Sequence, residues 1–521
     1  MKAYASKLDK NSPDYIENHK KMLDSVEQLK GQLQKALYQG EEKHTTRHQE
    51  AGKLLARDRI ELLLDQDSPF LELMALAGMD QPGIVTGGSI VAGIGLVENI
   101  ECLIIANVPT IRGGALNPVS VQKLQRLDVI ARENRLPTIY LVESAGADLP
   151  FQSQIFNYGG SLFREITRRS RLGIPSVSVV FGSSTAGGAY IPGMSDYVIM
   201  VKNQAKVYLA GPPLVKMATN EETTDEALGG ADMHSRLSGV SDYLAEDENH
   251  AIDLARQILA GLNYKKISLM PGGVFENPIY PAEEILGLAS FDVRKPYEVR
   301  EIIARLVDGS EFSEFKPLYG STLVTCFAKI FGVHVGILAN NGVLFPESAN
   351  KGCQFIQLCN QKNIPLIFLQ NITGFMVGQK YEESGVIKAG AKMINAVANS
   401  QVPAITIMMG ASYGAGNYAM CGRAYEPRFL FSWPNARLAV MGPDQLVGVL
   451  GLLKKDASAA QAEQKLKLQI EQESTSYFST SHLWDDGIID PRDTRTVIGL
   501  CLSTIHTNKI EGARDYGIFR M

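Results

Sequence analysis

Two stretches of small residues have the composition needed to do chemistry through their backbone amides. One contains Gly187, Gly188 and Ala189, and the other contains Ala415 and Gly416. Residues without bulky side chains let a ligand oxygen approach backbone N–H groups closely. Amide donors aimed at a developing oxyanion speed a reaction, by about 10²–10³ for a single donor in other enzymes. Each stretch therefore predicts an oxyanion hole, and two holes predict two enolate-like oxygens on two carbonyl compounds that react together.

An apolar run leads into each of these stretches. Both runs follow a Pro and end at a Gly, so we predict a fully buried strand that turns tightly into a helix N-terminus. Segment 174–190 aligns without a gap to 402–418 at an offset of 228 positions, and 136–142 matches 364–370 at the same offset. These matches predict an internal duplication. Plain packing of a strand against a helix is the alternative reading of one such turn, and the repeat weakens it.

The segments around the two stretches indicate an α/β fold. We expect strands at 90–96, 102–106 and 138–142, and helices at 119–133 and 162–171. Strands that alternate with helices are typical of α/β units.

The ends of the first half have a different composition. Residues 13–66 are charged and carry a leucine stripe, which predicts an N-terminal helical segment that packs on the body of the protein or on a partner. Several prolines in 263–297 are typical of a linker. We therefore expect two domains, at 1–270 and 285–521.

Composition excludes several classes of protein. The net charge of −5 shows no bias toward nucleic acid or membrane surfaces, and no window resembles a membrane span or a signal peptide. Six scattered cysteines form no CxxC pair, and no HExxH or GxxxxGK[ST] motif occurs. We expect a cytoplasmic protein whose chain holds no metal or nucleotide and binds neither nucleic acid nor membrane.

The motifs around these stretches resemble those of biotin-dependent acyl-CoA carboxylase β subunits, the carboxyltransferases of the crotonase superfamily. The resemblance runs from about Gly52 to the C-terminal region, and its second-half motifs are most similar to the methylcrotonoyl-CoA and geranyl-CoA carboxylase branch. The motifs are GKLLARDRI at 52–60, STAGGAY at 184–190, LAGPPLVK at 209–216, LGGAD at 228–232, ANNGVLF at 339–345, NITGFM at 371–376, YGAGNY at 413–418, WPNAR at 433–437 and LWDDGIID at 483–490.

The resemblance implies two duplicated crotonase-like domains of the ClpP/crotonase superfamily, the first on the acyl-CoA side and the second on the biotin side. Gly187 and Gly188 would hold the thioester oxygen of the acyl-CoA, and Ala415 and Gly416 would hold the ureido oxygen of biotin. CO2 would pass from carboxybiotin to the enolate of the acyl-CoA, with no side-chain base required. Glu143, at a strand end, is an alternative general base, but its counterpart in the repeat is Asn371.

The resemblance also implies partners. Biotin would be held covalently on a partner α subunit that contains the biotin carboxylase and the biotin carboxyl carrier. The β chains would form a homo-hexamer, a trimer of dimers, within a larger α–β complex. Further contacts are expected from two groups of residues, for which plain packing is the alternative. The substrate-binding group is Gly113, Gly114, Gly146, Ala147, Ala189 and Tyr418, and the biotin-side group is Thr373, Gly374 and Phe375.

The resemblance is compatible with several acyl groups. A branched or unsaturated acyl-CoA such as 3-methylcrotonoyl-CoA is expected, but 111–118 and 151–172 depart from the methylcrotonoyl pattern. Propionyl-, acetyl- and geranyl-CoA remain alternatives, as does a decarboxylase-type carboxyltransferase. A catalytically silent scaffold subunit is the alternative of another class, and a lone crotonase-type hydratase would not need the second half.

Overall fold

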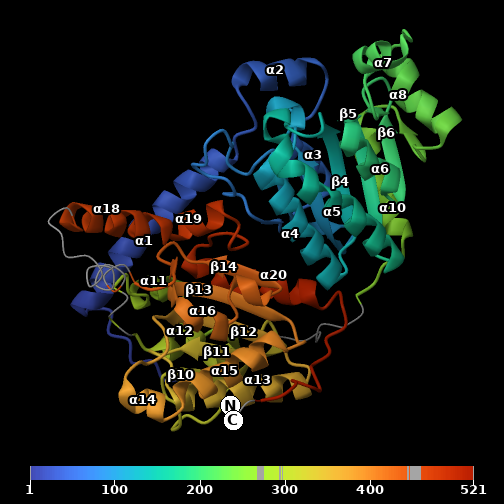
Figure 1. Ribbon diagram of the computed structural model, residues 1–521. Coiled ribbons are helices and arrows are strands. Elements are labelled where there is room, and N and C mark those ends of the chain that lie inside the picture. Colours follow the sequence, from blue (N-terminus) through green and yellow to red (C-terminus); the bar gives the residue numbers. More distant parts are fainter. Residues whose placement is uncertain are drawn as a thin grey trace. The chain divides into compact units, whose positions relative to one another are not determined.

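The structure is a computed structural model that describes residues 2–266, 275–292, 295, 297–442, 445 and 459–519. The chain divides into two compact units (Figure 1): Leu33–Lys266 forms one, and Met1–Gln32 together with Ile267–Met521 forms the other. The first 32 residues thus belong with the second half, whereas the expected domain 1–270 placed them with the first.

The unit Leu33–Lys266 is built on one sheet. Its strands are β1 (Leu71–Glu72), β2 (Ile90–Val97), β3 (Ile100–Asn107), β4 (Thr138–Ser144), β5 (Ser176–Thr185), β6 (Tyr197–Val201), β7 (Lys206–Tyr208) and β8 (Tyr243–Ala245). They lie in the order β1-β2-β3-β4-β5-β6-β8. The last residues of β5, after the stretch that pairs with β6, pair with β7. The pairs β1–β2 and β2–β3 are antiparallel and the other pairs are parallel.

Helices and short turns connect these strands. The helices are α2 (Glu42–Glu50), α3 (Ala56–Leu63), α4 (Pro118–Asn134), α5 (Gln152–Arg171), α6 (Tyr190–Met194), α7 (Pro212–Thr219), α8 (Asp225–Gly229), α9 (Ala231–Met233) and α10 (Glu248–Gly261), with the short turns η1 (Arg112–Gly114), η2 (Leu149–Phe151), η3 (Ala186–Ala189) and η4 (His234–Ser238). The predicted strands and helices of the first half are all present.

The other unit repeats this plan. Its strands are β9 (Phe312–Glu314), β10 (Leu323–Ile330), β11 (Val333–Asn340), β12 (Leu366–Ile372), β13 (Ala404–Tyr413), β14 (Phe429–Ser432) and β15 (Arg437–Ala439). The sheet order is β14-β13-β12-β11-β10-β9, and β15 pairs with β13. The helix α1 (Pro13–Ala36) lies in this unit up to Gln32. The other helices and turns of the unit are η5 (Ala282–Glu284), α11 (Ile285–Leu288), α12 (Val299–Leu306), η6 (Asp308–Ser310), α13 (Pro346–Gln361), α14 (Gln379–Glu383), α15 (Val386–Ala398), α16 (Gly414–Ala419), η7 (Arg423–Tyr425), α18 (Ala459–Glu473), α19 (Ser476–Ser481), η8 (Pro491–Asp493) and α20 (Thr494–Ile505).

The two sheets share a register irregularity that follows the sequence repeat. The β4–β5 pairing shifts between Val142 and Ser144, and the β12–β13 pairing shifts between Gln370 and Ile372. The offset of 228 relates these positions. The central strands are almost wholly buried, as expected for parallel strands covered on both faces. The structure therefore confirms a mixed α/β fold with two parallel-sheet domains.

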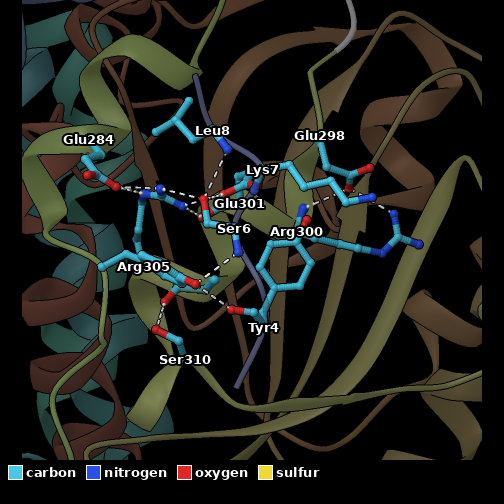
Figure 2. A network of polar contacts seen from close by, with 12 residues as sticks. Tyr4, Ser6, Lys7, Leu8, Glu284, Glu298, Arg300, Glu301, Arg305 and Ser310 are labelled. Carbon is cyan, nitrogen blue, oxygen red and sulfur yellow. Dashed lines mark hydrogen bonds and ion pairs between the residues drawn. The ribbon is translucent and has the colours of Figure 1, made fainter. Parts of the chain in front are cut away.

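The N-terminal residues are tied to α12 and its neighbours (Figure 2). Ser6 Oγ donates a hydrogen bond to Glu301 at 2.6 Å, and the Lys7 backbone N–H donates to the same carboxylate at 2.7 Å. Arg305, fully buried, bridges Glu301 and Glu284. These charged contacts explain why the first residues belong with the second half.

The leucine-rich helix α3 packs on the body of its own unit. Ala56, Arg59, Ile60 and Leu63 are its buried residues, and its neighbours are α10 and the sheet. Of the two alternatives for the N-terminal segment, packing on the protein itself therefore holds for this helix. No helix in the described part of the chain is long and apolar enough to cross a bilayer.

Candidate active site

The first predicted turn follows the end of β5. Ala186 adopts a left-handed backbone with φ 53°, and it directs the chain into η3. Gly187 is exposed, while Gly188 and Ala189 are buried. The side chain of Thr185, the residue before η3, makes no capping hydrogen bond. Side-chain caps normally satisfy the first amides of a helical turn, so this turn leaves that place open to a ligand.

The second turn has the same local geometry. β13 ends at Tyr413, Gly414 has φ 54°, Ala415 is exposed and Gly416 is buried. Tyr413 likewise provides no side-chain cap for α16. The four residues predicted to be catalytic therefore occupy equivalent places in two equivalent, uncapped turns.

A second loop lies beside each turn. Gly146, after β4, has its Cα 3.9 Å from a Cβ built at Gly188, and Gly374, after β12, has its Cα 3.4 Å from a Cβ built at Gly416. The Gly146 carbonyl accepts a hydrogen bond from the Leu116 N–H at 2.8 Å. In the same way, the Gly374 carbonyl accepts one from the Leu344 N–H at 3.1 Å. The structure thus brings Gly146 to the first turn and Gly374 to the second.

The other predicted contact residues divide into two groups. Ala147 is exposed beside Gly146, and Gly113 lines a cavity of about 580 Å³. Gly114 is buried, and a Cβ there would overlap the carbonyl of Glu143. Its small size is therefore required by packing. Ala189 is also buried.

In the group of residues predicted to contact biotin, the aromatic residue faces the core. The ring of Phe375 packs against Gly390 of α15, with a ring carbon 3.1 Å from a Cβ built there, and against the core of the sheet. Thr373 is half-buried. Tyr418 is 45% exposed, and its ring centroid lies 5.7 Å from that of Tyr425.

A cavity of about 860 Å³ opens at the second turn. Gly414, Ala415 and Tyr418 line it, together with an apolar and aromatic wall. The wall includes Met408, Leu430, Leu438, Val440, Ile470, Phe478 and Trp484. Thr373, Gly374 and Phe375 are not among its lining residues. A mainly apolar cavity with a few polar groups has the form of a small-molecule site.

The cavity that contains Gly113 is rich in cations. Arg47, Lys53 and Arg112 line it, along with His44 and His48. Glu41 is the only acidic residue among its described lining residues. Sequence reasoning missed these cations, although Lys53 lies in the GKLLARDRI motif. A cavity with this charge favours a phosphorylated ligand.

A buried ion cluster lies under this cavity. Lys53 Nζ is 2.5 Å and Arg59 Nη2 is 2.8 Å from the carboxylate of Glu143, and Arg59 also bonds Glu248 at 2.7 Å. Burial alone would raise the pKa of Glu143, but Arg59 and Lys53 hold that pKa below its usual value. A carboxylate held by two cations is a weak base, so the alternative of Glu143 as general base loses support.

An aromatic pair stands beside the first turn. Phe163 Cζ lies 3.5 Å from a Cβ built at Gly187, and the Phe163 ring makes an edge contact with Tyr190, with centroids 5.7 Å apart. Phe163 belongs to α5, within the segment where the sequence departs from the methylcrotonoyl pattern. Sequence reasoning did not single it out.

Comparison with known proteins gives consistent matches over nearly the whole chain. The family described as "Carboxyl transferase domain" matches residues 47–517. A Mycobacterium tuberculosis protein named probable biotin-dependent acyl-coenzyme A carboxylase beta2 subunit is 53% identical, with 99% of each chain covered. A Drosophila melanogaster protein named probable methylcrotonoyl-CoA carboxylase beta chain, mitochondrial, is 50% identical, with 99% of this chain and 95% of the relative covered. The crystal structure of the P. aeruginosa geranyl-CoA carboxylase β subunit superimposes with a TM-score of 0.92 at 44% identity, covering 99% of both chains.

Proposed function

The chain belongs to the carboxyl transferase domain family and is a β subunit of the biotin-dependent acyl-CoA carboxylase class, and from that premise we propose that it carboxylates 3-methylcrotonoyl-CoA or a related branched, unsaturated acyl-CoA. The observation that carries the proposal is the pair of equivalent, uncapped turns, each with a left-handed residue followed by small residues. One turn would serve each of the two reacting carbonyl compounds.

In this proposal the chain acts through amides and not through a side-chain base. The N–H groups of Gly187 and Gly188 hold the thioester oxygen as negative charge develops on it, with Gly146 and Ala147 beside them. The N–H groups of Ala415 and Gly416 hold the ureido oxygen of biotin. Fixed amide donors stabilise such charge without having to reorganise during the reaction.

The cavity at the second turn fits the biotin ring. Ala415 lines it, and Tyr418, Phe478 and Trp484 supply the apolar surface that a bicyclic ring would bury. Biotin, held on a partner subunit, supplies the CO2 that is transferred. Thr373 and Phe375 support the loop that carries Gly374, and they do not line this cavity.

Phe163 favours a short acyl chain. Its ring stands beside Gly187 and is braced by Tyr190, so it would limit the room for a long chain at the first turn. One methylene is worth roughly 1–3 kcal/mol of discrimination, so one pocket side chain can decide between acyl chains of different length. Geranyl-CoA, which has the longer chain, is the alternative that loss of the Phe163 ring should admit. Phe163→Ala should raise kcat/KM for geranyl-CoA relative to 3-methylcrotonoyl-CoA, whereas an unchanged ratio would remove this argument.

The cationic cavity would receive the phosphates of CoA. Arg47, Lys53 and Arg112 line it beside Gly113, and charge-assisted bonds to phosphate are among the stronger polar contacts. Arg47→Gln should raise KM for acyl-CoA with little change in kcat, because phosphate binding is the same in the ground and transition states. A fall in kcat at unchanged KM would place the phosphates elsewhere.

The assembly and location are further parts of the proposal. We propose an α subunit with biotin carboxylase and biotin carboxyl carrier as the partner, and a hexameric trimer of dimers for this chain. Cytoplasmic location stays a prediction from the sequence. A silent scaffold subunit remains the alternative of another class, and the retained small residues in both turns argue against it.

Carboxyl transfer by the purified chain tests the proposal. The assay combines carboxylated biotin carrier with acetyl-, propionyl-, 3-methylcrotonoyl- and geranyl-CoA. Transfer to 3-methylcrotonoyl-CoA that is lost in both Gly187→Val and Ala415→Val supports it, because these exposed positions let a side chain cover the amides without filling the core. Gly261→Val, on α10 with open space at its Cβ, is the matched control. A folded protein that carboxylates none of the four would favour the scaffold alternative.

A further inference from the structure

We propose that a buried chain of three side chains, Gln370, Ser412 and Asn417, positions the second turn for biotin and that the first turn has no equivalent of it. This inference rests on the proposed function of the second turn. Gln370 lies on β12, Ser412 lies near the end of β13, and Asn417 lies within α16. Gln370 and Ser412 are fully buried and act on the turn only through Asn417 and the Met420 carbonyl, so they are positioning residues.

The three side chains form one continuous hydrogen-bonded path. Asn417 Nδ2 donates to Ser412 Oγ at 2.8 Å, and Ser412 Oγ donates to Gln370 Oε1 at 2.6 Å. Gln370 Nε2 then donates to the backbone carbonyl of Met420 at 2.6 Å. Gln370 and Ser412 are fully buried and Asn417 is 8% exposed, so breaking one link leaves buried polar atoms unpaired.

The path holds both ends of the segment that carries Ala415 and Gly416. Ser412 precedes α16, which has only six residues, and the Met420 carbonyl follows it. A helix this short has little stability of its own, so its position depends on contacts with the sheet. The path supplies them, since β12 and β13 provide Gln370 and Ser412.

Close packing keeps the Asn417 side chain in one orientation. A Cβ built at Gly422 would overlap the Asn417 amide, and the Gly422 N–H donates to the Asn417 backbone carbonyl at 2.9 Å. The glycine thus lets the chain after α16 close over this amide. Asn417 also lines the 860 Å³ cavity, so the path extends from the sheet to the wall of the proposed biotin site.

The first turn is held differently. At the positions related by the 228-residue offset, Val142 replaces Gln370 and Ala189 replaces Asn417. Only the serine is shared: Ser184 Oγ donates directly to the carbonyl of Gly188 at 3.0 Å. Equivalent serines thus have different partners, which provides a matched pair of variants.

Ser412→Ala and Ser184→Ala, made in the full-length chain, test the inference by two independent measurements. The first is amide hydrogen exchange. In Ser412→Ala the amides of 414–420 should exchange tenfold faster or more while those of 186–190 are unchanged, and Ser184→Ala should show the reverse pattern. Unchanged exchange at 414–420 in Ser412→Ala would overturn the positioning role whatever the activity.

The second measurement is the kinetics of the reverse transfer, in which the carboxyl group of carboxylated 3-methylcrotonoyl-CoA moves to free biocytin and 3-methylcrotonoyl-CoA is released. Ser412→Ala and Asn417→Ala should each raise KM for biocytin tenfold or more and leave KM for the carboxylated acyl-CoA within twofold. The double variant should have a KM for biocytin no higher than that of Ser412→Ala. Equal losses for both substrates would overturn a role specific to biotin. A wild-type chain without transfer would count against the proposed function, while the exchange data would still decide the positioning role.

Discussion

One added methyl group should distinguish the two equivalent glycines of the turns. At Gly188, the nearest atoms to a new Cβ are Ser184 Oγ at 3.7 Å and Gly146 Cα at 3.9 Å, which are ordinary van der Waals distances. At Gly416, the new Cβ would lie 2.7 Å from Cγ1 of Ile372 and 3.4 Å from Gly374 Cα. Gly188→Ala therefore fits without movement, and Gly416→Ala forces the β12 side chain or the adjacent loop to shift.

The distances translate into a difference in stability. Overpacking a close-packed site costs about 1–3 kcal/mol, whereas Ala in place of Gly in a helical turn gains up to ~1 kcal/mol. The net loss for Gly416→Ala is then up to about 3 kcal/mol, and with about 2–4 °C of Tm per kcal/mol for a unit of this size it should lower Tm by up to roughly 12 °C. Gly188→Ala should leave Tm unchanged or raise it slightly.

Differential scanning calorimetry of both variants measures the difference, with Gly261→Ala as a control at a position with open space around the Cβ. A Gly188→Ala variant that loses as much Tm as Gly416→Ala would refute the reasoning, because the structure gives the two methyl groups unequal room. Equal Tm in all three variants would show that Ile372 moves at no cost, which would also refute it.

Three buried ionisable groups give further predictions. Burial raises the pKa of Asp485 to about 6, so the stability that its proton provides is complete below about pH 4 and is lost by about pH 6. Urea titrations should therefore show the free energy of unfolding falling across that range, and Asp485→Asn should remove the fall. Burial lowers the pKa of Lys123 to about 8. As the pH rises, the folded state therefore loses this proton before the unfolded state does, and the free energy of unfolding increases between about pH 8 and 10. Lys123→Met should abolish this increase. Glu143→Gln should cost about 3–5 kcal/mol of unfolding free energy, because it leaves the buried Arg59 short of negative charge, and urea titration at pH 7 measures the loss.

Each of these results has a clear contrary outcome. An unchanged slope of stability against pH in Asp485→Asn or Lys123→Met would mean that the group titrates as it does in the unfolded chain. A loss below about 1 kcal/mol in Glu143→Gln would mean that water reaches Arg59, as at a surface ion pair.

The repeated turns and the buried strands were predictable because their signals are local. The Pro, the apolar run, the Gly and the small residues lie within 17 consecutive positions of each copy, and each copy forms the same strand and turn. The shared shift in register at 142–144 and 370–372 shows how closely the copies keep their geometry.

Features that depend on pairs distant in sequence were not predictable. The ion pair of Arg59 with Glu248 spans 189 positions, and no periodic pattern reports such a pairing. The same holds for the cations of the 580 Å³ cavity and for Phe163 beside Gly187. At Gly114 the sequence shows that the residue must be small but does not show that the Glu143 carbonyl occupies the place of a Cβ.

The docking of the N-terminal residues on α12 has a consequence for how the protein is made. Ser6 bonds Glu301 across 295 positions of the chain, so it leaves the ribosome long before its partner does. At about 5–20 residues per second, the wait is roughly 15–60 s, during which the unit with Met1–Gln32 lacks most of its own sheet. The unit Leu33–Lys266 is complete in the meantime and can fold first. Chaperones that shield nascent chains would therefore meet the second unit, with its first segment still undocked, until the last third of synthesis.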